Sequence, residues 1–164
     1  MNKPLYSAEE RARRDASPWT LVQGLLAPLQ FLVFAVSLVL VLRFLITGSG
    51  EYAATCSILL KTLLLYAIMG TGCLWERDVY GRYLFAPAFF WEDVVSMLVM
   101  ALQTAYLLSW LGGWLEPRQQ MAIALAAYAA YVINATQFLL KLRAARLQAA
   151  RTATLPLQQL GWAE

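Results

Sequence analysis

The stretch WTLVQGLLAPLQFLVFAVSLVLVLRFLI, residues 19–46, decides the fold class of this chain. Arg43 is the one charged residue within it. The hydrocarbon core of a bilayer is about 30 Å thick, and a helix needs roughly 20 consecutive apolar residues to cross it. Ser17 and Pro18 stand where a helix N-cap and a first helical residue are expected. The stretch therefore predicts a helix that crosses a membrane.

Three further stretches share this length and apolar character, at about residues 52–75, 89–110 and 117–140. Over the whole chain 60% of the residues are hydrophobic and 14% are charged, whereas soluble domains have about 45–50% and 25%. The sequence therefore predicts an all-α, polytopic membrane protein with four transmembrane helices.

The chain is expected to form one membrane domain over residues 1–164, with tails outside the membrane at residues 1–17 and 147–164. Pro156 and Gly161 discourage a long helix in the C-terminal tail.

Basic residues fall on one side of this topology. They are Lys3, Arg11, Arg13, Arg14, Arg77, Arg82, Lys141, Arg143, Arg146 and Arg151. The opposite side has Arg118. Because cytoplasmic segments of membrane proteins carry an excess of Lys and Arg, both termini are predicted to be cytoplasmic.

The segment WERDVYGRYLFAPAFFWED, residues 75–93, concentrates acids, arginines and aromatic rings between the second and third helices. Aromatic residues beside a bilayer often only anchor the protein at the interface. The same composition also fits an aromatic-lined pocket for a flat amphipathic ligand, with arginines for an acidic edge. Both interpretations remain open at this point.

Glu92 and Asp93 open the third helix, where a carboxylate is favoured by the helix dipole without any function. However, Glu92, Ser96, Gln103 and Tyr106 share one helix face and form an inward polar stripe. Partial loss of water there disfavours the charged form of a carboxyl group, which suits a general acid.

Three other polar residues lie inside predicted spans. Lys61 sits near the middle of the second helix, where a cation is costly, and either pairs with Glu51 or Gln103 or serves a substrate or proton pathway. Asn134 and Gln137 either join helices or bind a ligand or a catalytic water.

A metal centre or a resident cofactor is not expected. The chain has no histidine, and Cys56 and Cys73 lie 17 positions apart, too far for a disulfide or a shared metal ion. Both cysteines are predicted to be small buried residues.

Three blocks resemble the vinyl bacteriochlorophyllide hydratase family (3-vinyl, older name 2-vinyl) of anoxygenic phototrophs. They are RARRDASPWTLVQG (11–24), GRYLFAPAFFWEDV (81–94) and YVINATQFLLKLR (131–143), and the likeness covers roughly residues 5–150. The resemblance implies a hydro-lyase of bacteriochlorophyll biosynthesis in the bacterial inner or intracytoplasmic membrane. Its substrate would be chlorophyllide a or a related Mg-tetrapyrrole, whose 3-vinyl group becomes 3-(1-hydroxyethyl).

For such a reaction we expect one carboxylic acid to protonate the vinyl group and one carboxylate to deprotonate the added water. Glu92 and Asp93 are the first candidates, with Glu76 or Asp78 as alternates, although adjacent helical residues point about 100° apart. The expected substrate-binding residues are Arg77 and Arg82 for the propionate, Tyr80, Tyr83, Phe89, Phe90 and Trp91 for the ring, and Lys61, Gln103, Asn134 and Gln137 for further polar contacts.

Two other classes of function stay open. One is a non-catalytic pigment-binding or assembly subunit of a photosynthetic membrane complex, and the other is an ion or proton transporter built around Lys61. The expected partners are the tetrapyrrole, the lipid bilayer, other enzymes of bacteriochlorophyll synthesis and a second copy of the chain. The net charge of +3 gives no reason to expect a nucleic-acid partner.

Overall fold

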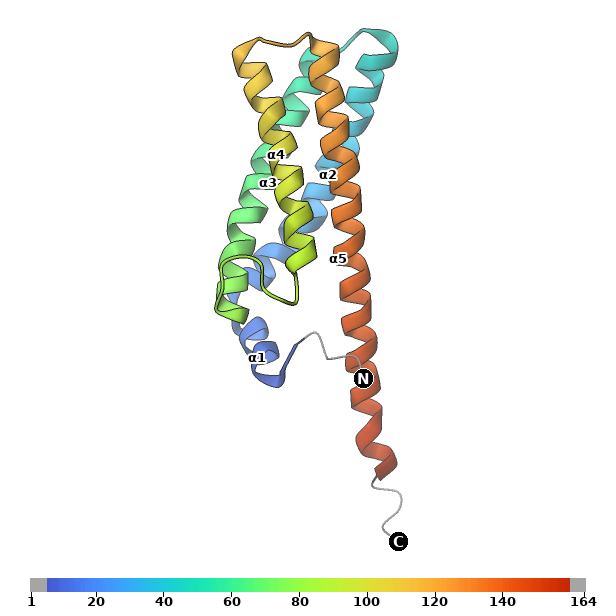
Figure 1. The fold of residues 1–164 in the computed structure, drawn as a ribbon. Helices are drawn as coiled ribbons and strands as arrows, with labels where there is room; N and C mark the ends of the chain where they lie inside the picture. Colours follow the sequence, from blue (N-terminus) through green and yellow to red (C-terminus); the bar gives the residue numbers. More distant parts are fainter. Residues whose placement is uncertain (1–5, 160–164) are drawn as a thin grey trace.

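The computed structural model describes residues 6–159, with side chains described at 6–147 and 150. This part of the chain is all-helical (Figure 1). Its helices are α1 (Ala8–Ala16), α2 (Pro18–Thr47), α3 (Glu51–Tyr80), α4 (Phe90–Gly112) and α5 (Pro117–Gln159). Four of them, α2, α3, α4 and α5 as far as Leu147, are long and apolar enough to cross a membrane. The predicted all-α class with four apolar spans is confirmed.

Three helix bounds differ from the prediction. A capping box at Ser7 starts α1 inside the expected N-terminal tail. Helix α3 continues beyond Trp75 to Tyr80, because no glycine or proline follows Trp75 until Gly81, which ends the helix at φ 74°. Helix α5 continues through Pro156 to Gln159, because alanine, leucine and arginine after Lys141 favour helix. The expectations at Lys3 and Gly161 lie outside the described residues.

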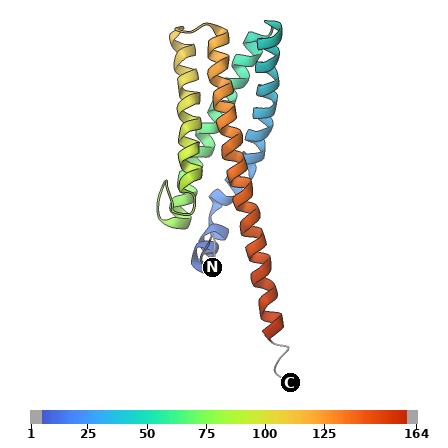
Figure 2. The same ribbon diagram turned by 45° about the vertical axis from the view of Figure 1, so that its right-hand side comes forward.

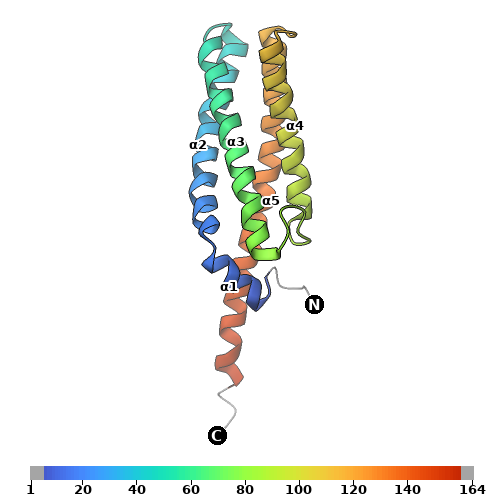
Figure 3. The same ribbon diagram turned by 90° about the vertical axis from the view of Figure 1, so that its left-hand side faces the viewer.

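The four long helices form two hairpins, α2 with α3 and α4 with α5. The helices pack closely within each hairpin, whereas the hairpins touch each other only lightly (Figure 3). We call the boundary between the hairpins the seam. Its hydrogen bonds join polar side chains: Ser37 with Tyr128 at 2.5 Å, Thr62 with Gln103 at 2.9 Å, and Tyr66 with Thr104 at 2.8 Å.

One end of the bundle gathers α1, the segment 81–89 and the lower half of α5, which runs past the other helices (Figure 2). All basic residues of the predicted cytoplasmic side that the structure describes lie at this end. The basic side of the sequence is therefore one physical end of the molecule.

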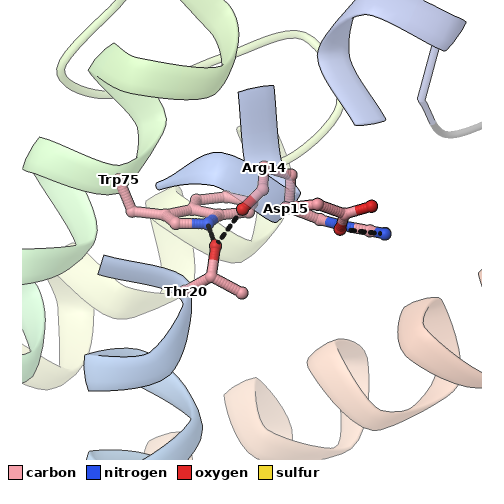
Figure 4. Close-up of polar contacts among 4 residues, drawn as sticks. All are labelled: Arg14, Asp15, Thr20 and Trp75. Carbon is pink, nitrogen blue, oxygen red and sulfur yellow. Dashed lines mark hydrogen bonds and ion pairs between the residues drawn. The ribbon is translucent and has the colours of Figure 1, made fainter. Parts of the chain in front are cut away.

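Helix α1 is fastened to this end by its junction with α2. The Thr20 hydroxyl donates to the Arg14 carbonyl at 2.6 Å and accepts from the Trp75 indole at 2.9 Å (Figure 4). Arg14 also pairs with Asp15 at 2.6 Å. Because Trp75 belongs to α3, these bonds hold the N-terminal helix close to the segment 81–89.

Candidate active site

Two buried carboxylic acids from different hairpins meet at the basic end. Glu76 lies near the end of α3 and Asp93 lies in the first turn of α4, and they are only 6% and 4% exposed. They accept hydrogen bonds from two consecutive backbone N–H groups, so their carboxyl groups lie close together. The sequence placed both residues among the candidates, but it did not pair them.

The segment 81–89 holds this pair in place. The Phe85 N–H donates to Asp93 Oδ2 at 2.7 Å, and the Ala86 N–H donates to Glu76 Oε2 at 3.1 Å. Phe85 has φ 57°, a conformation that a bulky residue rarely adopts. Consecutive N–H groups around a left-handed residue form a concave donor site for anions. The strained residue thus aims one donor at each acid.

Glu92 takes a different partner. Its carboxylate lies 2.6 Å from Lys141 Nζ, and the Lys141 ammonium also donates to the Ala88 carbonyl and lies 4.7 Å from the centre of the Phe89 ring. Adjacent acids therefore face apart, as the helical geometry allows: Asp93 faces Glu76 and Glu92 faces α5. Lys141 was not among the predicted site residues, because in the sequence it is one of many cations at this end.

The predicted aromatic residues divide into an inner and an outer group. Phe89 is buried and packs against Trp75, Tyr80 and Phe138 with ring centres 5.6–5.9 Å apart. The outer group is exposed and consists of Tyr83, Phe90 and Trp91. The inner group also includes Tyr6, which stacks on Tyr80 and has no periodic signal in the sequence.

The remaining charged candidates of the segment 75–93 point outward. Asp78 is exposed and accepts a hydrogen bond from Ser17 at 2.7 Å, so it ties α3 to the start of α2 instead of joining the acid pair. Arg77 and Arg82 are exposed, and the Arg77 guanidinium lies 5.1 Å from the centre of the Tyr83 ring. Both arginines remain at the surface around the acid pair.

The predicted polar stripe of α4 is confirmed, since Glu92, Ser96, Gln103 and Tyr106 are all buried. The Asn134 amide donates to Ser96 at 2.7 Å and joins α5 to α4. Asn134 Oδ1 and Gln137 Oε1 are buried without a hydrogen-bond partner within residues 6–147. Asn134 therefore joins helices and also offers a free acceptor.

Lys61 is fully buried, and its Nζ atom has no hydrogen-bond partner in the part of the chain that the structure describes. It lies 3.8 Å from the centre of the Tyr131 ring across the seam. The predicted pairing with Glu51 or Gln103 is therefore wrong: Gln103 Oε1 bonds to Thr62, and Gln103 Nε2 has no partner. Among the described residues Lys61 forms no ion pair with an acid.

The cysteines and the surface hollow lie apart from the acid pair. Cys56 is exposed, so its predicted burial is wrong, and Cys73 is half-buried; both thiols are free. Cys56 is on the outward face of α3, beside a hollow of about 340 Å³. That hollow is lined by Tyr52, Leu59 and Trp110 among others and lies at the opposite end of α3 from Glu76. Among the described residues no cluster of acids or cysteines could hold a metal ion.

Similarity to known proteins identifies the family of this chain. The family model of 2-vinyl bacteriochlorophyllide hydratase matches residues 6–144. A 2-vinyl bacteriochlorophyllide hydratase of Rhodobacter capsulatus is 70% identical over 90% of this chain and 86% of its own length. One of Cereibacter sphaeroides is 67% identical over 89% of this chain and 91% of its own length. No solved structure matches. The chain therefore belongs to the 2-vinyl bacteriochlorophyllide hydratase family.

Proposed function

We propose that this chain hydrates the 3-vinyl group of chlorophyllide a or a related Mg-tetrapyrrole to 3-(1-hydroxyethyl), with Glu76 and Asp93 as its acid and base. Family membership supports the reaction. The single structural observation that carries the mechanism is that consecutive backbone N–H groups hold two buried carboxyl groups, from different hairpins, close together.

Two carboxyl groups in contact do not both ionise easily, because like charges repel strongly where little water is present. One proton shared by the pair relieves this repulsion. The pair then supplies an acid and a base side by side, the arrangement that acid–base chemistry on one substrate needs.

In the first step the protonated member gives its proton to the terminal vinyl carbon, and the double bond supplies the electrons. The carbon next to the macrocycle becomes a cation that the ring delocalises. Water adds to this carbon, and the ionised member accepts the proton that the water releases. The product is the secondary alcohol, and the pair again holds one proton.

The residues around the pair have supporting roles in this proposal. Lys141 donates to the Glu92 carboxylate and to the Ala88 carbonyl and so fixes the segment 81–89, which makes Glu92 a positioning residue. Asn134 Oδ1 and Gln137 Oε1 are free acceptors for the reacting water, since a bound water needs several polar partners.

The molecular surface around the pair suits an acidic, flat pigment. Tyr83, Phe90 and Trp91 present exposed rings, and Arg77 and Arg82 attract negative charge to this end. The basic end is placed in the cytoplasm by the positive-inside rule, with the bundle in the bacterial inner or intracytoplasmic membrane. The substrate brings its own Mg, and the protein supplies no cofactor.

The test is to incubate detergent-purified protein with chlorophyllide a and follow absorption and mass. Loss of vinyl conjugation with the mass gain of one water is expected for the native chain. Glu76→Gln and Asp93→Asn should each lower kcat by about 10²–10⁴-fold. Asp78→Asn is the matched control, because this acid is exposed on the same turn of α3 and should stay within about twofold of native activity. Full activity in both pair variants would overturn the assignment, and bound but unchanged pigment would favour a pigment-carrying role.

A further inference from the structure

We infer that Lys61 binds the propionate carboxylate of the substrate inside the seam between the two hairpins. This inference rests on the proposed function, and it deepens that function by naming the group that makes the enzyme accept a free-acid pigment. Three observations support it: a cation without a counter-ion, the free amide nitrogen of Gln103, whose oxygen bonds to the neighbouring Thr62, and an apolar cluster between Lys61 and the acid pair.

The described part of the chain provides no negative charge for Lys61. Along α3 the nearest acids are Glu51 and Glu76, 10 and 15 positions away, or about 15 and 22 Å at 1.5 Å per residue. Helices α2 and α5 contain no acid, and α4 has none beyond its first turn. A buried charge normally has a partner. A carboxylate that arrives with the substrate would provide one.

Gln103 supplies further donor capacity at the same depth. Its Nε2 atom is buried without a partner in the described chain, while Thr62 fixes the other end of the amide. An ammonium and an amide N–H on facing helices are suitable donors for the two oxygens of a carboxylate. The aromatic face of Tyr131 holds the ammonium in place until the ligand arrives.

Between Lys61 and the acid pair the seam contains an apolar cluster, although Tyr66 and Thr104 also share a hydrogen bond across it. A buried cluster there joins both hairpins through Leu65, Val99 and Ala130, with Met69 and Met100 packed against it. Methionine side chains are flexible and adapt to irregular ligands. The seam thus presents an acid pair, an apolar stretch and a cation in sequence, which matches the vinyl edge, the macrocycle and the propionate of a chlorophyllide.

The spacing agrees with the size of the ligand. The vinyl group and the propionate stand on different pyrrole rings and point away from each other, with about 12 Å between their ends at roughly 1.5 Å per bond. Lys61 and Glu76 are about 22 Å apart along α3. Their side chains shorten this gap by up to about 10 Å. One pigment can therefore reach both residues, and light contact between the hairpins lets them part around it.

The experiment compares chlorophyllide a with its methyl ester, which has the same vinyl group and no carboxylate. For the native chain we expect KM for the ester to exceed KM for the acid by about tenfold or more, a loss typical of one charge-assisted hydrogen bond. Lys61→Gln should raise KM for the acid by a similar factor, change kcat less, and leave KM for the ester unchanged. Arg43→Gln is the matched control, because it removes another cation of the spans, one that is exposed on α2.

Equal KM values for acid and ester in the native chain would overturn the inference, and this comparison needs no variant. The inference would also fail if Arg77→Gln or Arg82→Gln removed the preference for the acid while Lys61→Gln retained that preference. The propionate would then bind at the surface. If the native chain hydrated neither pigment, the proposed function would fail separately. Binding of acid and ester, followed by the pigment's absorption shift, would then decide the role of Lys61 on the same criterion.

Discussion

Two polar regions of this bundle differ in how their hydrogen bonds are satisfied. At the basic end, Glu76, Asp93 and Glu92 each have a donor: Ala86 N–H, Phe85 N–H and the Lys141 ammonium. Halfway along the seam, Lys61 Nζ and Gln103 Nε2 have none among the described residues. The three acids of the first region have hydrogen-bond donors without a ligand, whereas the second region has donors without an acceptor.

This difference separates two tasks of an active site. A catalytic pair must hold its geometry before substrate arrives, so its partners come from the protein itself. A group that recognises a ligand needs unpaired hydrogen-bond donors, although each buried donor without a partner costs about 1–3 kcal/mol of stability. Lys61 therefore lowers the stability of the fold, whereas Glu76, which has a backbone partner, does not.

The largest expected effect tests whether the acids act as one unit. If one proton is shared, the double variant Glu76→Gln/Asp93→Asn should lose no more activity than the worse single variant, because either change already ends the exchange. Single-turnover hydration rates in detergent would measure this. Losses that multiply would mean that the two acids act independently and would contradict the shared-proton description.

The next effect concerns stability at the basic end. Lys141→Met leaves Glu92 buried opposite an apolar side chain, so we expect about 2–4 kcal/mol lower stability. Adding Glu92→Gln should recover most of this loss, since the unpaired charge disappears. Thermal unfolding of the four members of this double-mutant cycle gives the coupling energy directly. A coupling near zero would show that the ion pair does not hold the segment 81–89.

Replacing the lysine of the seam by methionine should change stability in the opposite direction. Lys61→Met removes a buried cation without a partner and fills the same volume with an apolar side chain, so we expect about 1–2 kcal/mol higher stability in the absence of pigment. Unfolding without and with chlorophyllide a should show a larger ligand-induced gain in the native chain than in the variant. Destabilisation as large as that of Lys141→Met would mean that Lys61 has a partner, and the contrast between the regions would disappear.

Most of the fold was predictable because hydropathy in a membrane protein reports directly on span length. Four apolar stretches gave four spans, and the helical period of Glu92, Ser96 and Gln103 gave the buried face of α4. The pairing of helices into two hairpins could not be read in the same way. Each membrane-spanning helix is apolar on most of its faces, so no single apolar stripe shows which face meets the neighbouring helix.

The site was only partly predictable for a different reason. Glu76 and Asp93 were named among the acids, but their contact depends on the path of the segment 81–89 and on the left-handed Phe85. Composition marked that segment as unusual without giving its path. Lys141 had no distinguishing signal among the basic residues, and the exposure of Cys56 depends on which face of α3 meets the other helices.

The smallest effect tests whether the stacking of Tyr6 on Tyr80 couples α1 to the aromatic cluster at the basic end. Tyr6 is 7% exposed and stacks on Tyr80, and burial raises the pKa of its phenol above the usual value of 10. Since the folded state favours the neutral phenol, this stabilisation is present below pH 10 and is lost as the pH rises through the folded-state pKa. Tyr6→Phe keeps the ring and removes the titration.

Fluorescence of Trp75, which packs against Tyr80, should therefore change at alkaline pH in the native chain and stay constant in Tyr6→Phe. The expected cost of losing the contact is about 0.5–1.5 kcal/mol, the usual value of an aromatic pair. An identical alkaline transition in both proteins would show that Tyr6 does not couple α1 to the aromatic cluster. The aromatic cluster would then end at Tyr80. The hydrogen bonds of Thr20 with Trp75 and of Ser17 with Asp78 would join α1 to α3 without it.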